Sequence, residues 1–149
     1  MSKSNDGAYL ENAVQSYPDF QDRIDMACDR LPDTRSARNI IKAQNADFFI
    51  STKKTGGFYL ECKSVGGKKK ILRYFRQYPL MHRWSQAGVP GYVLIHYHEM
   101  DEIVLVEVGK LPDLKGKQWD VSSRPVFFGK EDKDVWEVLE FLLRKGGAI

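Results

Sequence analysis

Three charged residues in the middle of the chain have the types and the spacing that phosphodiester hydrolysis requires. Asp47 and Glu61 have their midpoint at residue 54, inside the polar, glycine-containing segment 52–57. If that segment is a hairpin turn, the two carboxylates lie opposite each other on adjacent strands. Side chains alternate along a strand, so Glu61 and Lys63 share one face while Cys62 points into the core.

This arrangement suits a hard divalent cation held beside a phosphate. Mg²⁺ takes oxygen ligands and keeps several waters, so Asp47, Glu61 and the backbone carbonyl of Cys62 would suffice to hold it. The ion would activate a water and stabilise the charge of the transition state. Lys63 would position the attacking water or neutralise the developing negative charge. An alternative interpretation makes Glu61 and Lys63 the solvated face of an amphipathic strand.

Basic residues surround the acidic pair in the sequence, where a phosphate backbone would have to lie. A solvated loop or hairpin tip is the alternative interpretation for those that precede Glu61. The candidates for DNA contact are Arg35, Arg38, Lys53, Lys54, Lys68, Lys69, Lys70, Arg73 and Arg76.

The composition is that of one globular domain, which we expect to span residues 1–149. Of the 149 residues, 42% are hydrophobic and 29% are charged, and the net charge of +3 is too mild to identify a nucleic-acid partner. Cys28 and Cys62 lie far apart, which favours reduced thiols over a zinc site or a disulfide framework. No segment reaches the roughly 18 apolar residues of a membrane span. We therefore expect a cytoplasmic protein that is neither exported nor anchored.

Periodicity in the first half of the chain predicts a helix, a strand and a hairpin. Apolar residues recur at helical spacing over residues 10–17, and the predicted helix carries Glu11. Residues 20–31 fit a helix or a strand, and we favour the strand. Segments 47–51 and 58–63 are rich in aromatic and branched residues, which predicts two strands joined by a turn. Residues 32–45 are interpreted as a polar connection.

The second half predicts further helices and strands, and hence a mixed α/β domain. Apolar residues at helical spacing from Ile71 to Tyr78 predict a helix that continues towards Trp84 and is basic on one side. Segments 92–98 and 103–108 are interpreted as strands. The apolar stripe over 132–145 predicts a closing helix.

These residues resemble a known family. Asp47 followed by Glu61-Cys62-Lys63 matches the motif of the PD-(D/E)XK nuclease superfamily, and the order helix, strand, hairpin, helix, strand is similar to its core. The segment from Gly7 to Glu11 resembles the G-x-x-L-E opening of RecU-type and archaeal-type Holliday junction resolvases. Residues 82–111 are similar to the C-terminal half of the RecU-type enzymes. The resemblance covers about residues 7–111.

The resemblance implies a restriction-endonuclease-like core, with a mixed central β-sheet flanked by helices. It implies a homodimer that binds four-way DNA junctions and cuts two strands symmetrically with Mg²⁺ or Mn²⁺. Asp47 and Glu61 would bind the metal, Lys63 would be catalytic and Glu11 would be an accessory acid. Ala46 stands where the nominal motif has proline, and the long DNA-engaging insertion of RecU-type proteins has no obvious counterpart. A trimmed version of this kind would suit a phage-encoded enzyme.

Two other interpretations of the function stay open. The same fold could cut linear or mismatched duplex, or the chain could be a DNA-binding module without catalysis. The histidines, His82, His96 and His98, have no acid or cysteine at a compelling metal-ligand spacing, so structural or surface roles are favoured. Tyr74, Tyr78 and Trp84 are better interpreted as core or subunit-interface residues than as stacking platforms for bases.

Overall fold

The computed structural model describes residues 8–31, 46–54, 56–112 and 118–145, which form helices, strands and one 3-10 helix. The helices are α1 (Ala8–Gln15), α2 (Asp19–Asp22), α3 (Tyr78–Gln86) and α4 (Asp132–Lys145), and the 3-10 helix is η1 (Val108–Lys110). The strands are β1 (Met26–Arg30), β2 (Phe48–Thr52), β3 (Gly56–Val65), β4 (Ile71–Arg73), β5 (Gly91–Tyr97), β6 (Glu102–Glu107), β7 (Gln118–Asp120) and β8 (Val126–Phe128).

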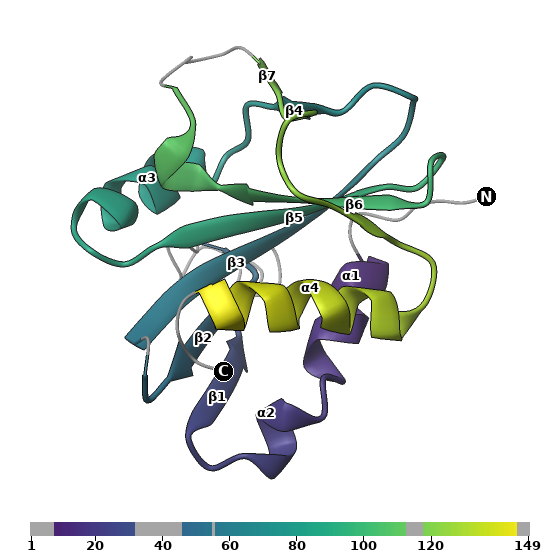
Figure 1. Ribbon diagram of the computed structural model, residues 1–149. Helices are drawn as coiled ribbons and strands as arrows, with labels where there is room; N and C mark the ends of the chain where they lie inside the picture. Colours follow the sequence, from purple (N-terminus) through teal and green to yellow (C-terminus); the bar gives the residue numbers. More distant parts are fainter. Residues whose placement is uncertain (1–7, 32–45, 55, 113–117, 146–149) are drawn as a thin grey trace, which may run out of the picture.

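Six of the strands form one sheet in the order β1-β2-β3-β5-β6-β8, and β4 pairs separately with β7. β3 runs parallel to β5, whereas every other neighbouring pair in the large sheet is antiparallel. The α/β class is therefore confirmed, with a mixed central sheet that is flanked by helices (Figure 1). The order α1, β1, the β2–β3 hairpin, α3 and β5 also agrees with the order predicted from the sequence.

The β2–β3 hairpin has the predicted register. Phe48 lies opposite Leu60, and Thr52 lies opposite Gly56. Continued by one residue, the same register places Asp47 opposite Glu61. The parallel partner β5 then locks β3 from its other side, with Glu61 opposite Val93. The strand that carries Glu61 is therefore internal to the sheet and paired on both edges.

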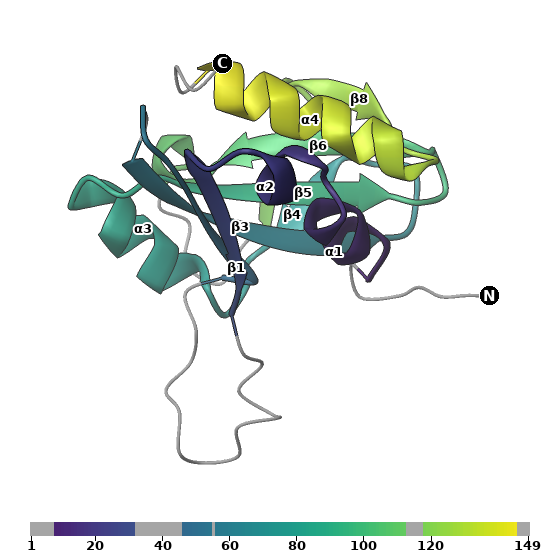
Figure 2. The same ribbon diagram turned by 90° about the horizontal axis from the view of Figure 1, so that it is seen from below.

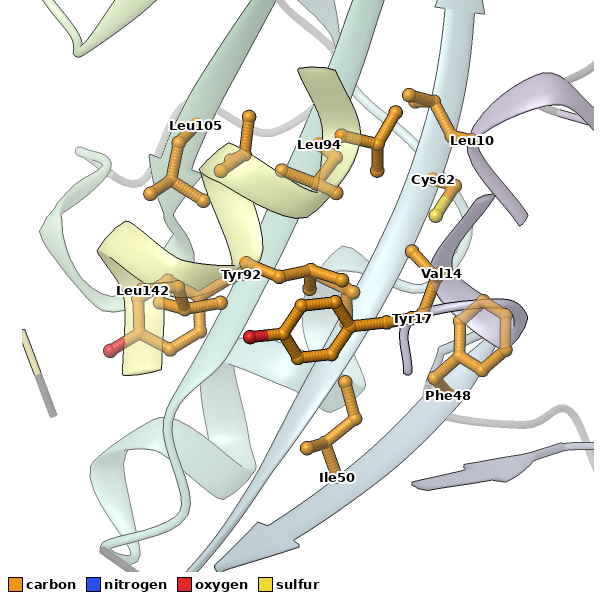
Figure 3. Close-up of a cluster of buried hydrophobic side chains, with 14 of the residues drawn as sticks. Leu10, Val14, Tyr17, Phe48, Ile50, Cys62, Tyr92, Leu94, Leu105 and Leu142 are labelled. Atoms are coloured by element: carbon orange, nitrogen blue, oxygen red, sulfur yellow. The ribbon is translucent and has the colours of Figure 1, made fainter. Parts of the chain in front are cut away.

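Each face of the sheet packs against its own hydrophobic cluster. On one face, α1 and α4 bury residues such as Leu10, Val14 and Leu142 against even-numbered residues of β3, including Cys62 (Figures 1 and 3). The same helices lie over the sheet in Figure 2, where the molecule is seen from below. On the other face, α3 and the β4–β7 pair cover a second cluster that includes Met81. Odd-numbered residues of β3 point to this second face.

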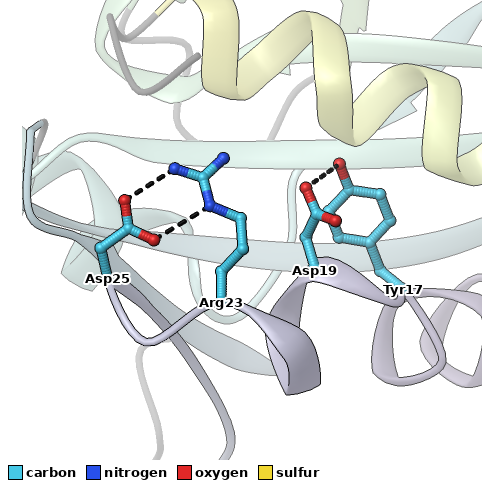
Figure 4. A network of polar contacts seen from close by, with 4 residues as sticks. All are labelled: Tyr17, Asp19, Arg23 and Asp25. Atoms are coloured by element: carbon cyan, nitrogen blue, oxygen red, sulfur yellow. Dashed lines mark hydrogen bonds and ion pairs between the residues drawn. The ribbon is translucent and has the colours of Figure 1, made fainter.

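The segment between α1 and β1 is held by two local polar contacts (Figure 4). The guanidinium of Arg23 donates two hydrogen bonds to Asp25, at 3.0 and 2.6 Å, and the hydroxyl of Tyr17 donates one to Asp19 at 3.4 Å. The Tyr17–Asp19 contact lies at the start of α2, and the Arg23–Asp25 contact lies between α2 and β1. Of the ambiguous segment 20–31, residues Met26–Arg30 form the strand that we favoured, while its first residues belong to α2.

The helix predicted from Ile71 onwards is wrong in its first half. Ile71–Arg73 is strand β4, and the helix begins only at Tyr78, with Pro79 in its first turn. A distant partner overrides the local periodicity, because Leu72 lies opposite Trp119 of β7 and both side chains are buried. Arg73 and Arg76 are therefore not on a basic helix. The sequence analysis also missed β7 and β8, which are three residues each.

Two further predictions, on the cysteines and on membrane-spanning segments, can be compared with the structure. Both cysteines are free thiols, half-buried at Cys28 and buried at Cys62. Among the residues that the model describes, no helix is long and apolar enough to cross a membrane.

Trp136 on α4 should contribute measurably to stability, because its indole Nε1 donates a 2.9 Å hydrogen bond to the carbonyl of Ala13 on α1. Trp136→Phe keeps an aromatic ring but removes the donor, and we expect a loss of about 1 kcal/mol in unfolding free energy. Trp84→Phe is the control, because Trp84 is 42% exposed, and it should change stability by less than about 0.5 kcal/mol. Urea unfolding measures both, and equal effects would contradict this docking of α1 on α4.

Candidate active site

Asp47 lies immediately before β2, one residue beyond the last backbone pair between β2 and β3. Its carboxylate takes the place of a backbone acceptor at this point. Its Oδ2 accepts a hydrogen bond of 2.9 Å from the backbone N–H of Cys62. Phe48 and Ile50 point into the cluster beneath α1 and α4, so Asp47 lies on the opposite face by strand alternation. That is the face of Glu61, and the two predicted metal ligands are therefore brought together.

Glu61 is buried in the middle of the sheet, with only 4% of its surface exposed. Burial raises the pKa of its carboxyl from 4.5 to about 8, and the nearby charge of Asp47 adds to the rise. The ammonium of Lys63 acts in the opposite direction and lowers this pKa. The interpretation of Glu61 as part of a solvated strand face is wrong, because an internal strand covered by α3 and the β4–β7 pair keeps water out.

Among the residues that the structure describes, one oxygen of Glu61 has a polar partner and the other has none. Oε2 lies 3.3 Å from Nζ of Lys63. Oε1 is buried and has no hydrogen-bond partner among the described residues. A buried carboxylate oxygen without a donor is costly, because it has lost its hydration without compensation. Such an atom is a functional-site signal, since a bound cation would satisfy it.

Lys63 lies on the same face as Glu61, two residues further along β3. Its side chain is partly exposed, and its ammonium lies 4.9 Å from the centroid of the Phe75 ring as well as next to Glu61. The amine is therefore placed at the border between the buried carboxylate and solvent. The structure brings together Asp47, Glu61 and Lys63 as the sequence analysis predicted.

The backbone carbonyl of Cys62 is directed towards Asp47. Tyr59 donates its N–H to the carbonyl of Pro90, which immediately precedes β5, so odd-numbered residues of β3 direct their backbone groups to β5. The even-numbered residues face β2, and the Cys62 N–H that bonds Asp47 agrees with this alternation. The thiol itself is buried among apolar residues, and burial raises its pKa well above the ordinary value. The carbonyl of Cys62 as a metal ligand stays a prediction.

The oxygen atoms of Asp47, Glu61 and the Cys62 carbonyl suit a hard cation that takes few ligands from the protein. In the described part of the chain, His, Cys, Asp and Glu side chains form no group of three or more that could hold a metal ion. Two carboxylates and a carbonyl supply only oxygen, which Mg²⁺ and Mn²⁺ accept while keeping several waters. The observation that makes this set chemically reasonable is Oε1 of Glu61, which is buried and has no hydrogen-bond partner in the part of the chain that the structure describes.

Glu11 on α1 lies close enough to Glu61 to raise the pKa of that carboxyl by charge repulsion. It forms an ion pair with Arg30 of β1, and Arg30 also reaches Gln15. The sequence analysis missed Arg30, which stands outside every motif considered there. Its pairing with Glu11 places a cation beside the acidic residues and was not detectable from spacing.

The predicted DNA-contacting residues fall into separate groups. Lys68 and Lys69 are exposed after the end of β3, whereas Lys70 is 2.8 Å from Glu102 and is partly neutralised. Arg73 is exposed on β4, and Arg76 is exposed just before α3. Arg35 and Arg38 lie outside the described residues.

Lys53 and Lys54 are exposed in the β2–β3 turn, which agrees with the alternative interpretation as a solvated hairpin tip. It stands at the far end of β2, about 20 Å along the strand from Asp47 at the usual rise per residue. An antiparallel hairpin necessarily separates its tip from its open end, and the acids are at the open end.

The histidines and aromatic residues have structural contacts. The ring Nε2 of His96 is 2.9 Å from the carbonyl of Gly129, and His82 packs on Tyr78. Tyr74 and Tyr78 pack against Trp119 on the second face of the sheet. Tyr78 is a core residue, as the sequence analysis favoured.

Comparisons with known proteins give limited information. No protein-family model matches the chain, and no curated protein matches it in sequence. Among solved structures, the chain is similar to Hjc, a Holliday junction resolvase from the archaeal hyperthermophile Archaeoglobus fulgidus. The two are 14% identical with a TM-score of 0.43, and the match covers 68% of this chain and 79% of that one. At this level of similarity, the function has to be argued from the site.

Glu61→Gln should stabilise the metal-free protein progressively as the pH rises. Between the ordinary pKa of 4.5 and about 8, the unfolded chain releases a proton that the folded chain keeps. The unfolding free energy of the wild type therefore falls over this range, whereas glutamine carries no such proton. We expect the variant to gain about 4 kcal/mol over the wild type between pH 4.5 and pH 8.5, because each unit of pKa shift corresponds to about 1.4 kcal/mol.

Urea unfolding with a chelator at pH 4.5, 6.5 and 8.5 measures this gain. Glu137→Gln, on the exposed face of α4, is the control and should show no comparable trend. A difference between wild type and Glu61→Gln that does not change with pH would show that Glu61 titrates normally in the fold.

Proposed function

We propose that this protein is a metal-dependent DNA endonuclease that resolves four-way (Holliday) junctions by paired symmetric nicks. The observation that carries the proposal is the site at the open end of the β2–β3 hairpin, where Asp47, just before β2, shares one face of the sheet with Glu61 and Lys63 of β3. Burial of Glu61 with one oxygen unpartnered among the described residues is energetically unfavourable for the free protein. A function that needs a cation at this point accounts for that cost.

The order of secondary-structure elements also supports a nuclease of the PD-(D/E)XK type. That superfamily, which the motif residues resemble, has the order helix, strand, hairpin, helix, strand. The same order is found in α1, β1, β2–β3, α3 and β5. Its metal ligands lie on the hairpin, where Asp47 and Glu61 are found. A motif that occurs by chance would not be expected to coincide with both features.

Each residue of the site has a role that follows from its chemistry. Asp47, Glu61 and the carbonyl of Cys62 would hold Mg²⁺ or Mn²⁺. When bound, the ion supplies positive charge at the phosphate and lowers the pKa of a coordinated water. The Cys62 N–H fixes the carboxylate of Asp47, which prevents it from rotating away. Lys63 donates hydrogen bonds to the attacking water or to a phosphate oxygen.

Glu11 is proposed as an accessory acid. Its charge reaches Glu61, and Arg30 restrains its carboxylate at the edge of the site. This pairing keeps Glu11 close to the metal ligands without burying an uncompensated charge.

The phosphate backbone of the DNA is proposed to contact the exposed basic residues that follow β3. Lys68 and Lys69 extend from the strand that carries Glu61, and Arg73 lies on the β4–β7 pair above the same face of the sheet. Arg76 is the fourth member of this group. Lys70 contributes less, because Glu102 already neutralises it. Such contacts orient DNA without reading its sequence.

A homodimer is proposed because the described residues of one chain offer one such site and symmetric resolution requires two nicks. A two-fold axis would relate the two sites and match the symmetry of a four-way junction.

Cation binding should depend on Glu61 and on pH. Titration calorimetry with Mn²⁺ should detect binding to the wild type, and Glu61→Gln should weaken it at least about tenfold. Because the cation has to displace the proton of a carboxyl with a pKa of about 8, affinity should fall about tenfold for each unit of pH below that value. Glu137→Gln is the matched control and should bind like the wild type. Binding that is independent of pH would argue that the ion lies elsewhere.

Cleavage should be confined to branched DNA. A synthetic four-way junction and its linear duplex arms are incubated with Mg²⁺ and with wild type, Glu61→Gln or Lys63→Met. We expect paired symmetric nicks in the junction alone, and a loss of at least about a hundredfold in rate for each variant. Lys54→Met, at the distant hairpin tip, should leave the rate within about threefold.

The alternative functions predict different results in this assay. Cutting of the linear arms at a comparable rate would assign the protein to the nucleases that act on duplex DNA. Binding without scission under both Mg²⁺ and Mn²⁺ would instead leave a DNA-binding module without catalysis, and the enzymatic proposal would be abandoned.

A further inference from the structure

The ammonium group of Lys63 lies between a carboxylate and an aromatic ring. Its Nζ is 3.3 Å from Oε2 of Glu61 and 4.9 Å from the centroid of the Phe75 ring. A cation at this distance over a ring face is attracted by the negative charge density of the face. Phe75 lies between β4 and α3, and nothing in the spacing of the acidic motif pointed to it.

The ring of Phe75 is itself held firmly. It is 6% exposed, and it makes edge contacts with the rings of Tyr78 and Trp119 at 6.0 and 6.4 Å between centroids. The carbonyl of Phe75 accepts a 3.0 Å hydrogen bond from the N–H of Tyr78, which fixes the backbone at the start of α3. A ring packed in this way has little freedom to swing away from Lys63.

Trp119 connects this ring to the small sheet. It lies opposite Leu72 in the β4–β7 ladder, and its indole Nε1 donates a 2.7 Å hydrogen bond to the carbonyl of Pro112. The small sheet, the start of α3 and the amine of Lys63 are therefore linked through consecutive packed contacts. This gives the β4–β7 pair, which has no part in the acidic motif, a structural connection to the reacting groups.

An aromatic ring restrains an ammonium group without cancelling its charge. A carboxylate in the place of the Phe75 ring would neutralise Lys63, and an amide there would compete for its hydrogens. With the ring on one side and Glu61 on another, the ammonium keeps positive charge and N–H donors for a phosphate oxygen or a water. Orientation of this kind lowers the entropy that is lost when the reacting groups come together.

We propose that Phe75 is a positioning residue that holds the ammonium of Lys63 in place through the face of its ring. The inference rests on the proposed nuclease function for its catalytic consequence, whereas the contact itself can be tested without any substrate. It extends the site to the segment between β4 and α3.

The test of the contact is the ring-current shift of Lys63 in the free protein. Protons above an aromatic ring resonate at high field, so the ε-methylene signals of Lys63, assigned by comparison with Lys63→Arg, should be shifted in the wild type. Phe75→Leu should return them to ordinary lysine positions, and Phe75→Tyr should retain the shift. Phe58→Leu is the matched control, because Phe58 is also 6% exposed but packs on Tyr92 on the opposite face of the sheet.

The test of the consequence is junction cleavage by the same variants. Phe75→Leu should lower kcat about tenfold and leave KM for the junction within about twofold, because the amine is misplaced while DNA contacts remain. Phe75→Tyr should recover most of the rate, and Phe58→Leu should keep the rate of the wild type. Unshifted Lys63 signals in the wild type, or equal losses of kcat in Phe75→Leu and Phe58→Leu, would overturn the proposal.

A failure of the proposed function gives a different result. If the wild type cuts no DNA, the nuclease function is contradicted. If its Lys63 signals nevertheless move when Phe75 is changed, the contact between Phe75 and Lys63 is still supported.

Discussion

The pairing of β3 with β2 on one side and β5 on the other is the constraint on which the site depends. The antiparallel ladder to β2 sets which residue faces Asp47, and the parallel ladder to β5 keeps β3 inside the sheet. Because the side-chain period of a strand is two, a slip of one residue would move Glu61 and Lys63 to the face that packs against α1 and α4. The register is secured by the apolar residues on that face, including Leu60 and Cys62.

Covering the second face of the sheet has two opposite energetic effects: it stabilises the apolar residues there and destabilises the charged form of Glu61. Covering the second face of the sheet excludes water from a carboxylate that would otherwise be hydrated, and its pKa rises for that reason. The apolar residues of β5 and β6 stabilise the domain by the same burial. A buried carboxylate lowers the stability of the free protein, and the same low-dielectric surroundings would strengthen its interaction with a cation if the proposed metal were bound.

The two faces of the sheet differ in the side chains that they bury. The face under α1 and α4 is apolar and holds the thiol of Cys62 within it, as Figure 3 shows. The other face places Glu61 and Lys63 next to an aromatic group that includes Phe75, Tyr78 and Trp119. The β4–β7 pair and α3 therefore do more than complete a core, because they define the apolar surroundings of the charged residues.

The sequence by itself determined the local features: the hairpin, the position of Asp47 opposite Glu61, the shared face of Glu61 and Lys63, and the flanking helices α1 and α4. These follow from strand alternation, turn chemistry and helical spacing, which act between near neighbours in the chain. Only the tertiary structure decided that Glu61 is buried, that Ile71–Arg73 is a strand, and that Arg30 and Phe75 stand beside the site. Burial and pairing of this kind depend on residues far apart in the sequence, such as Leu72 and Trp119, whose contacts outweigh local propensity.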